Sequence, residues 1–261
     1  MSEAPYIERL EASGLVTLTL NRGDRYNPLS RAMIAALESE IDGIAANASA
    51  RVVVLSAAGK GFCAGHDLKE MRSHAGDLAW QQELFQSCGR MMSKLTRMPQ
   101  PVIARVHGIA TAAGCQLVSM CDVVVASSVA TFALPGVNLG IFCSTPAVGV
   151  VRSIGLKRTM EMLLTGEPID AARAHAFGLV NRVVPPEALD EEVARLADTI
   201  LAKSPAVVGL GKRAFYEQIE VGLDEAYGLM AEAMAKNMML ADAEEGIDAF
   251  LEKRSPCWRG E

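Results

Sequence analysis

The sequence lacks an excess of basic residues. It has 25 lysines and arginines against 31 aspartates and glutamates, which gives a formal net charge of -6. Because affinity for the phosphate backbone of nucleic acids needs a basic face, this balance argues against a nucleic-acid-binding protein. It leaves room for a small polyanionic ligand that is held by a few local cations.

Long hydrophobic runs are missing as well. No stretch of the sequence approaches the roughly 20 apolar residues in a row that a membrane-spanning helix needs. The first residues, MSEAPYIERLEASG, have neither the basic start nor the apolar run of a secretory signal. We therefore expect a cytoplasmic protein that does not insert into membranes.

Paired cysteine motifs are also absent. The six cysteines contain no C-x-x-C pair, and most of them lie in apolar runs. This pattern indicates buried thiols rather than a disulfide framework or a zinc site. The cysteines are Cys63, Cys88, Cys115, Cys121, Cys143 and Cys257. We expect no bound metal.

Residues 1–186 have the pattern of an α/β domain. Runs rich in β-branched residues are typical of strands in a buried sheet. These runs lie at residues 16–20, 51–57, 101–108, 122–127 and 179–184. Between the first two runs, Ser30 can cap a helix whose apolar residues keep helical spacing. The apolar residues of this helix are Met33, Ile34, Leu37, Ile41 and Ile44.

Residues 187–261 show helical patterns only. Amphipathic segments cover residues 206–220, 223–240 and 243–253. Four methionines give the second of these segments a soft apolar face, which is more typical of a core or a subunit contact than of catalysis. They are Met230, Met234, Met238 and Met239. We predict a helical C-terminal region that follows the α/β domain.

Two loops rich in small residues each follow a predicted strand and precede a predicted helix. In the first, GKGFCAGHDLKEM at residues 59–71, glycines let the backbone turn and expose peptide N–H groups near His66. The second, GIATAAGCQLV at residues 108–118, allows a ligand close to its backbone. Two N–H donors that converge on one carbonyl oxygen form an oxyanion hole. The alternative is that each loop is only a tight turn.

The first loop also matches a loose dinucleotide-binding fingerprint through Gly59, Gly61 and Ala64. That fold needs a second strand that ends in an acidic residue about 20 positions further on. Residues 76–95 have the spacing of a helix instead. The fingerprint is therefore the weaker interpretation of this loop.

Several motifs occur in order from about residue 12 to the C-terminus. They are the two loop motifs, ATFALPGVNLGIF, MEMLLTGEPIDAARAHAFGLVNRVVP and EEGIDAFLEKRSP. Together they resemble the crotonase superfamily, also called the enoyl-CoA hydratase/isomerase family, and one animal branch of it in particular. The resemblance implies a crotonase-type spiral of ββα units in residues 1–186 and a trimerisation region in residues 187–261.

The same resemblance implies a homotrimer or a dimer of trimers. It implies an acyl-CoA or enoyl-CoA thioester as substrate, a role in fatty-acid or acyl-CoA metabolism, and an oxyanion hole that stabilises an enolate. Coenzyme A is then part of the substrate, and no separate cofactor is expected.

Matching the family motifs residue by residue implies a set of site residues. The oxyanion donors fall on the backbone N–H groups of His66 and Ala113. The coenzyme A moiety would pass Arg25, Ala64, Asp67 and Leu68, with Lys253 and Met234 at its adenine end, in some members from a neighbouring subunit. Phe142 would form part of an apolar pocket wall. Arg25 and Lys253 would supply cations for the phosphates.

The family's two catalytic glutamates are missing at the matching positions, which Gln116 and Gly136 occupy. A carboxamide has no proton that titrates in the useful range, so Gln116 cannot act as a general base. Glycine contributes no functional group. Hydratase activity by the family's usual chemistry is therefore doubtful. If Gln116 and Gly136 occupy the acid–base positions, replacing both residues by glutamate should restore some hydration of a short enoyl-CoA.

Other residues could supply the missing chemistry. Cys143 or Ser144 could attack a polarised thioester in an acyl-CoA thioesterase, or could only line the pocket. The imidazole of His66 could act as an acid or base, or the loop could use only the backbone of this residue. Asp67 and Asp122 are typical helix caps or structural partners. A further alternative is a non-catalytic acyl-CoA-binding protein.

Overall fold

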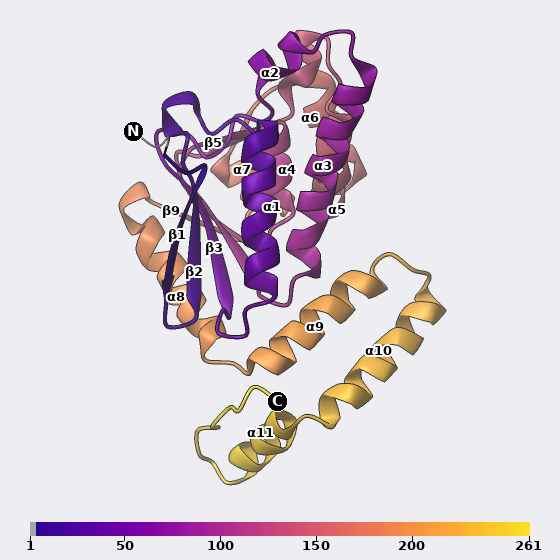
Figure 1. Ribbon diagram of the computed structural model, residues 1–261. Coiled ribbons are helices and arrows are strands. Elements are labelled where there is room, and N and C mark those ends of the chain that lie inside the picture. Colours follow the sequence, from indigo (N-terminus) through magenta and orange to yellow (C-terminus); the bar gives the residue numbers. More distant parts are fainter. Residues whose placement is uncertain (1–3) are drawn as a thin grey trace.

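The computed structural model of the chain describes residues 4–261 (Figure 1). Within these residues a six-stranded sheet has the order β1-β2-β3-β4-β6-β9. Its strands are β1 (Ile7–Ala12), β2 (Leu15–Leu20), β3 (Val52–Ala57), β4 (Val102–Val106), β6 (Val123–Ser127) and β9 (Arg182–Val184). β1 and β2 are antiparallel, and the other neighbours are parallel.

All five predicted strands occur, although the last is shortened to β9. The reason is that the N–H groups of Leu179 and Val180 both donate to the Ala174 carbonyl, at 3.0 and 3.3 Å. These bonds close the turn after α7 (Ala171–Phe177), so the two residues cannot pair with the sheet.

A second sheet of three short strands produces the spiral. Its order is β5-β7-β8, with β5 (Ile109–Thr111), β7 (Thr131–Ala133) and β8 (Ile169–Asp170). The chain passes from β4 directly to β5, and from β6 to β7, and helices follow each short strand. These helices are α4 (Ala113–Ser119), η2 (Pro135–Leu139), α5 (Ser144–Ile154), α6 (Leu156–Thr165) and α7. The predicted crotonase-type spiral of ββα units is confirmed.

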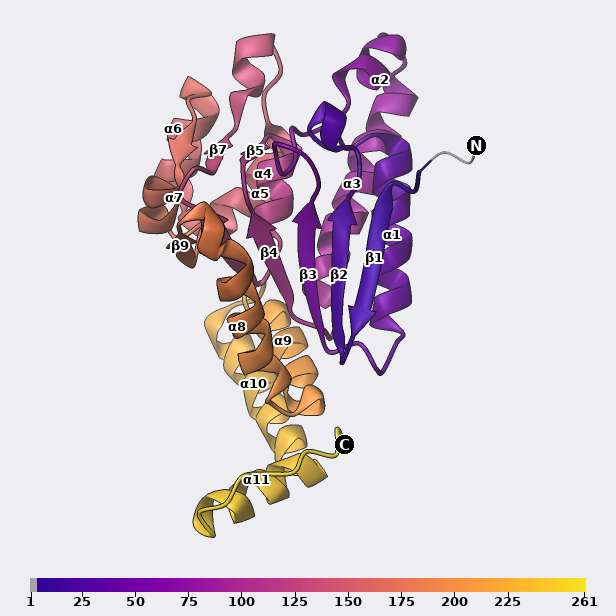
Figure 2. The same ribbon diagram turned by 90° about the vertical axis from the view of Figure 1, so that its left-hand side faces the viewer.

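Helices cover both faces of the large sheet (Figures 1 and 2). They are α1 (Arg31–Ala45) and α3 (Leu78–Arg97) on one face, and α8 (Leu189–Leu201) on the other. Every residue of β3 is buried, as expected for a central parallel strand. On the second face, Leu189 and Val193 pack in one cluster with Val52 and Val54. α8 is therefore part of the core packing, although it follows residue 186.

The predicted helix after Ser30 is α1. The Ser30 hydroxyl accepts the N–H of Met33 at 3.2 Å, which caps the helix as expected. All five apolar residues predicted for its inner face are buried. Five of the six cysteines are also buried free thiols, as predicted, whereas Cys257 is exposed.

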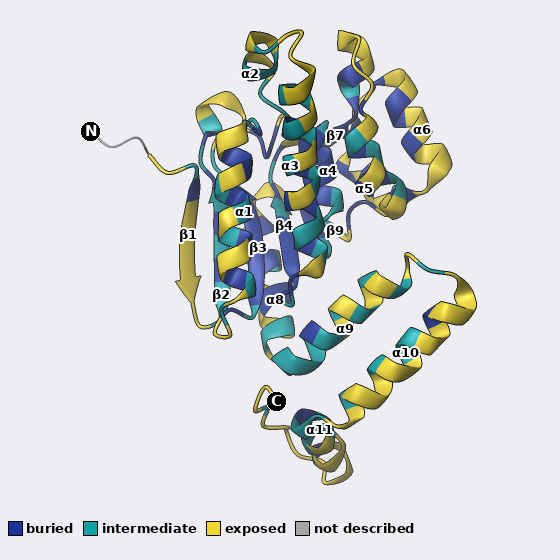
Figure 3. Ribbon diagram, turned by 45° about the vertical axis from the view of Figure 1, so that its right-hand side comes forward, coloured by how far each residue is buried: buried dark blue, intermediate teal, exposed yellow. Residues whose placement is uncertain are grey.

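The C-terminal helices begin and end within two residues of the predicted segments. They are α9 (Pro205–Gln218), α10 (Leu223–Met238) and α11 (Ala241–Leu251). α10 and α11 project from the end of the core opposite α2 (Leu68–Ser73), and most of their surface is exposed (Figures 1 and 3). Met234 and Met239 are 62% and 82% exposed. The predicted methionine face therefore lies open in the single chain.

A buried ion pair holds α9 to the core. The Lys212 ammonium lies 2.6 Å from the Asp122 carboxylate and donates to the Leu95 and Gln100 carbonyls at 2.8 Å each. Burial lowers the pKa of Lys212, and Asp122 opposes this shift. Asp122 also accepts the Val102 N–H at 2.6 Å. Asp122 is thus a structural partner, which was one of the two roles predicted for it, the other being a helix cap.

Replacing Lys212 by methionine should lower the free energy of unfolding by about 3 kcal/mol, because the Asp122 carboxylate then stays buried without its partner. Urea titration measures this loss. Lys236→Met is the matched control, because Lys236 pairs with Glu232 on the surface of α10. An exposed pair contributes only about 0–1 kcal/mol. Equal losses in the two variants would show that the buried pair has no special role.

Candidate active site

The two small-residue loops run side by side. Cys63 and Ala110 form a parallel β-bridge. The Cys63 N–H donates to the Ile109 carbonyl at 3.0 Å, and the Thr111 N–H donates to the Cys63 carbonyl at 2.9 Å. The Thr111 hydroxyl also donates to the Ala64 carbonyl at 3.0 Å. The loops after β3 and β4 therefore form one hydrogen-bonded unit.

Glycines allow this close approach. A Cβ atom on Gly114 would lie 2.1 Å from the Cys63 carbonyl oxygen, which leaves no room for a side chain. Gly65 has a φ of +92°, and a Cβ atom there would lie 3.0 Å from Ala112 Cβ and 3.4 Å from Ala113 N. Only glycine adopts this positive φ at little cost in free energy and also leaves room for the neighbouring loop.

Two amide N–H groups remain unbonded where the loops meet. Among the residues that the structure describes, the N–H groups of His66 and Ala113 donate no hydrogen bond. A Cβ atom on Gly65, which precedes His66, would lie 3.4 Å from Ala113 N, so the segments that carry the two amides adjoin each other. Ala112 holds the start of α4 with a φ of 49° and a ψ of -119°, a conformation that costs about 1–3 kcal/mol outside glycine. Such strain is typical of functional sites.

Gln116 lies one turn into α4 and is only 4% exposed. Within residues 4–261, its buried Oε1 atom has no hydrogen-bond partner. A buried acceptor without a partner costs about 1–3 kcal/mol. This oxygen is therefore available to a donor such as a water molecule or a polar group of a substrate.

The His66 side chain contacts two residues that are distant from it in the sequence. Its Nδ1 lies 3.2 Å from the Leu29 carbonyl oxygen, and its ring meets the edge of the Phe85 ring at a centroid distance of 5.3 Å. Burial lowers the pKa of His66, and the contact with Leu29 opposes this shift. Leu29 and Phe85 were not predicted, because neither adjoins the loop motifs in the sequence.

Gly136 does not leave the open space that the sequence suggested. It is buried in η2, and a Cβ atom on it would lie 2.4 Å from the Ile141 carbonyl oxygen and 2.7 Å from Cys143 Sγ. The chain between η2 and α5 fills the volume that a side chain would occupy. The packing therefore argues against the expectation that a functional glutamate can replace Gly136.

Cys143 and Ser144 lack the features of an activated nucleophile. Burial raises the pKa of Cys143, so its thiol stays protonated, although the Gly136 backbone opposes the shift. The exposed Ser144 hydroxyl donates only to the Phe142 carbonyl, at 3.4 Å. In the described part of the chain, none of the four histidines hydrogen-bonds either residue. Activation by a neighbouring base is what such a nucleophile needs.

Four of the predicted coenzyme A contacts lie around the loops. Arg25 ends η1 (Gly23–Arg25), with 54% of its side chain exposed and Asp24 at 3.7 Å. The following Tyr26 carbonyl accepts the Ala64 N–H at 2.9 Å, which places η1 beside the first loop. Asp67 caps α2 by accepting the Lys69 N–H at 3.0 Å. Leu68 is exposed, and so is Phe142 on the segment before α5.

The structure does not bring Lys253 or Met234 to these loops within one chain. Lys253 follows α11, and Met234 lies on α10. Figures 1 and 2 both place α10 and α11 at the end of the molecule opposite α2. Both residues lie far from the loops because the C-terminal helices run away from the core. Within one chain, these two residues therefore lie away from the candidate site.

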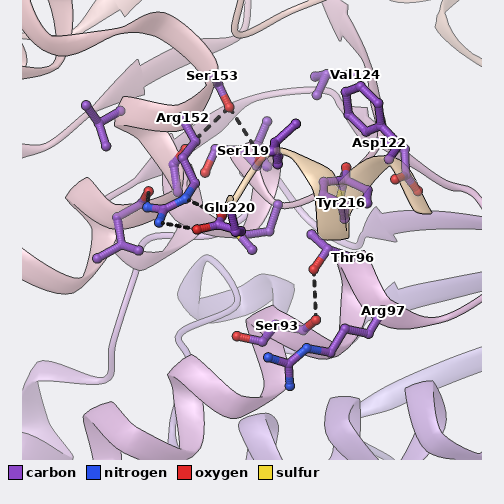
Figure 4. Close-up of a pocket in the computed structure, with 18 of the residues that line it drawn as sticks. Ser93, Thr96, Arg97, Ser119, Asp122, Val124, Arg152, Ser153, Tyr216 and Glu220 are labelled. Atoms are coloured by element: carbon purple, nitrogen blue, oxygen red, sulfur yellow. Dashed lines mark hydrogen bonds and ion pairs between the residues drawn. The ribbon is translucent and has the colours of Figure 1, made fainter. Parts of the chain in front are cut away.

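A well-defined cavity lies elsewhere. It measures about 1370 Å³ and is lined by parts of α3, α4, α5 and α9 (Figure 4). An Arg152–Glu220 ion pair at 3.0 Å spans it, and the Ser153 hydroxyl donates to the Ser119 carbonyl at its edge. None of the predicted site residues lines this cavity. It is the groove between the core and the C-terminal helices.

No group of three or more His, Cys, Asp or Glu side chains is placed to hold a metal ion among residues 4–261. In the same part of the chain, no helix has the length and apolar character that crossing a membrane requires.

The two sheets, the adjoining loops and the helical C-terminal region define a crotonase-fold protein. The chain belongs to the enoyl-CoA hydratase/isomerase family, whose model matches residues 11–261. It is 45% identical to the mitochondrial enoyl-CoA hydratase domain-containing protein 3 of Rattus norvegicus, over 98% of this chain and 85% of that protein. The predicted resemblance to one animal branch is confirmed.

Solved structures agree. An enoyl-CoA hydratase of Mycobacterium smegmatis has a TM-score of 0.96 and 51% identity, covering 98% of this chain and 99% of that chain. The human enoyl-CoA hydratase domain-containing protein 3 has a TM-score of 0.93 and 45% identity, covering 97% and 100%.

The expectation of a cytoplasmic protein is wrong by this comparison, because the rat relative carries a mitochondrial name. Composition reflects the demands of folding in water, which are alike in different aqueous compartments. It therefore carries little information about the compartment in which a domain works.

Proposed function

We propose that the protein is an acyl-CoA enzyme that binds the carbonyl of a CoA thioester between the N–H groups of His66 and Ala113. The observation that carries this proposal is the pair of unbonded amides in two loops joined through Cys63. Each such donor contributes about 2.7–4 kcal/mol to an oxyanion. The site can thus stabilise the enolate of the thioester, and coenzyme A serves as part of the substrate.

In this proposal Gln116 holds a water molecule or a polar group of the acyl chain. Its buried Oε1 lacks a partner, and Gln116 follows Ala113 by one turn of α4. Arg25 faces the phosphates from the first loop's side. The exposed apolar faces of α10 and α11 support a homotrimer or a dimer of trimers, in which Lys253 of one chain reaches the coenzyme A bound to another.

Acetoacetyl-CoA tests the oxyanion hole directly, because its enolate absorbs in the ultraviolet. Binding to the protein should raise the ratio of the enolate to the keto form by roughly 10²–10³, the effect of one good donor on an oxyanion. A titration followed by absorbance measures this. Free coenzyme A added in excess is the control, because it should displace the ligand and remove the signal. Binding without any gain in enolate would contradict the proposed donors.

The second candidate is a protein that binds acyl-CoA without turning it over. The packing around Gly136 favours it, since no carboxylate fits there. Mass spectrometry on a panel of CoA thioesters, with the parent and Gln116→Ala compared, separates the two functions. Products that depend on Gln116 support the enzyme, and tight binding without products supports the second candidate.

A further inference from the structure

The imidazole of His66, whose backbone N–H is one of the two unbonded amides, is fixed at two points. Its Nδ1 lies 3.2 Å from the Leu29 carbonyl oxygen, and Phe85 of α3 packs its ring against the imidazole at 78°. Leu29 is fully buried, and its N–H donates to the Gly65 carbonyl at 2.8 Å. The ring is thus tied to the same short segment that carries the oxyanion loop.

These contacts decide which nitrogen carries the proton. A carbonyl oxygen can only accept, so Nδ1 must donate, and in a neutral imidazole Nε2 then holds a free lone pair. Burial keeps the ring neutral, since it lowers the pKa of His66. Nε2 is buried and, among the described residues, has no hydrogen-bond partner. The side chain therefore presents an unused proton acceptor.

Other groups at the site are less suited to this role. Gln116 has no titratable proton in the useful range. The pKa of Cys143 is raised by burial. The Asp67 carboxylate caps α2, where its Oδ1 accepts the N–H groups of Lys69 and Glu70 at 3.0 and 3.2 Å. Gly136 has no functional group. Within the described site, His66 is the side chain of the oxyanion loop that holds a buried nitrogen lone pair without a hydrogen-bond partner.

We propose that His66 Nε2 removes a proton from the carbon next to the thioester carbonyl. This inference rests on the proposed function. The C–H bond breaks and the proton moves to Nε2. The electron pair of the broken bond forms the carbon–carbon double bond of the enolate. The negative charge resides on the thioester oxygen, between the two amides. Return of a proton from Nε2 to carbon reverses the step, so the exchange needs no other reactant.

Exchange of carbon-bound hydrogen for deuterium tests this step without knowledge of the natural product. The protein is incubated with butyryl-CoA in D₂O, and mass spectrometry follows deuterium at the carbon next to the carbonyl. The parent should catalyse exchange, and His66→Gln should slow it by roughly 10² or more, the usual contribution of general acid–base catalysis. The dissociation constant of butyryl-CoA should change little, because glutamine keeps the backbone N–H.

His175→Gln is the matched control. The His175 Nδ1 also contacts a carbonyl oxygen, that of Val180 at 2.8 Å, but on α7 and outside the site. This variant should exchange deuterium as fast as the parent. A second variant, His66→Ala, should be slow and should recover when free imidazole is added. Recovery would show that the base itself, and not the shape of the loop, was lost.

Three results would overturn the proposal. Exchange by His66→Gln at the rate of the parent would show that another group removes the proton. A parent that binds butyryl-CoA and raises the enolate of acetoacetyl-CoA, yet catalyses no exchange, would refute the role of His66 while the oxyanion hole stands. Absence of any CoA-thioester binding would instead remove the proposed function, and this inference with it.

Discussion

Gly114→Ala will abolish most of the enolate stabilisation. The added methyl carbon would lie 2.1 Å from the Cys63 carbonyl oxygen, far inside van der Waals contact, so α4 and the first loop must move apart. This movement separates the amides of His66 and Ala113. Misplacement of a catalytic group by about 1 Å can cost roughly 10² in rate, and we expect a similar loss in the enolate signal of acetoacetyl-CoA.

The same substitution should also lower stability. Adding a methyl group to a filled site typically costs about 1–3 kcal/mol. Gly228→Ala in α10 is the matched control, because a Cβ atom on Gly228 meets nothing within 4 Å. Alanine in an exposed helix interior is better than glycine by roughly 0.5–1 kcal/mol, so the control should be slightly stabilised. A Gly114→Ala variant with the full enolate signal would show that the loop contact does not position the amides.

Periodicity and small-residue loops predicted most of the scaffold. The apolar spacing after Ser30 gave α1 and its buried face, because a helix has to bury one stripe of side chains. The glycines around His66 predicted a sharp turn with exposed amides, because a positive φ at Gly65 is inexpensive only for glycine. These features depend on residues that are near one another in the sequence.

Contacts between distant residues could not be predicted in this way. The tautomer of His66 depends on the Leu29 carbonyl, 37 positions earlier in the chain. The lack of room at Gly136 depends on how residues 141–143 fold back, which no local pattern specifies. The position of Lys253 depends on the direction that α9 to α11 take from the core, and helical periodicity carries no information about direction.

Gly136→Glu will unfold or severely destabilise the protein rather than restore a catalytic acid. Its Cβ atom alone would overlap the Ile141 carbonyl and Cys143 Sγ, and the rest of the side chain would place a carboxyl group in a filled interior. Overpacking costs about 1–3 kcal/mol, and a buried carboxyl group without partners adds a comparable penalty, so we expect a loss of about 4 kcal/mol or more. Urea titration measures it.

Gly89→Glu separates the effect of packing from that of the new charge. Gly89 lies on α3, where a Cβ atom meets nothing within 4 Å, so glutamate there can extend into solvent. This control should retain nearly the stability of the parent. If Gly136→Glu unfolds at the same urea concentration as Gly89→Glu, the segment between η2 and α5 must move aside at little cost in free energy. The site could then accept a carboxylate at Gly136, and the missing glutamate would reflect a different reaction rather than a lack of space.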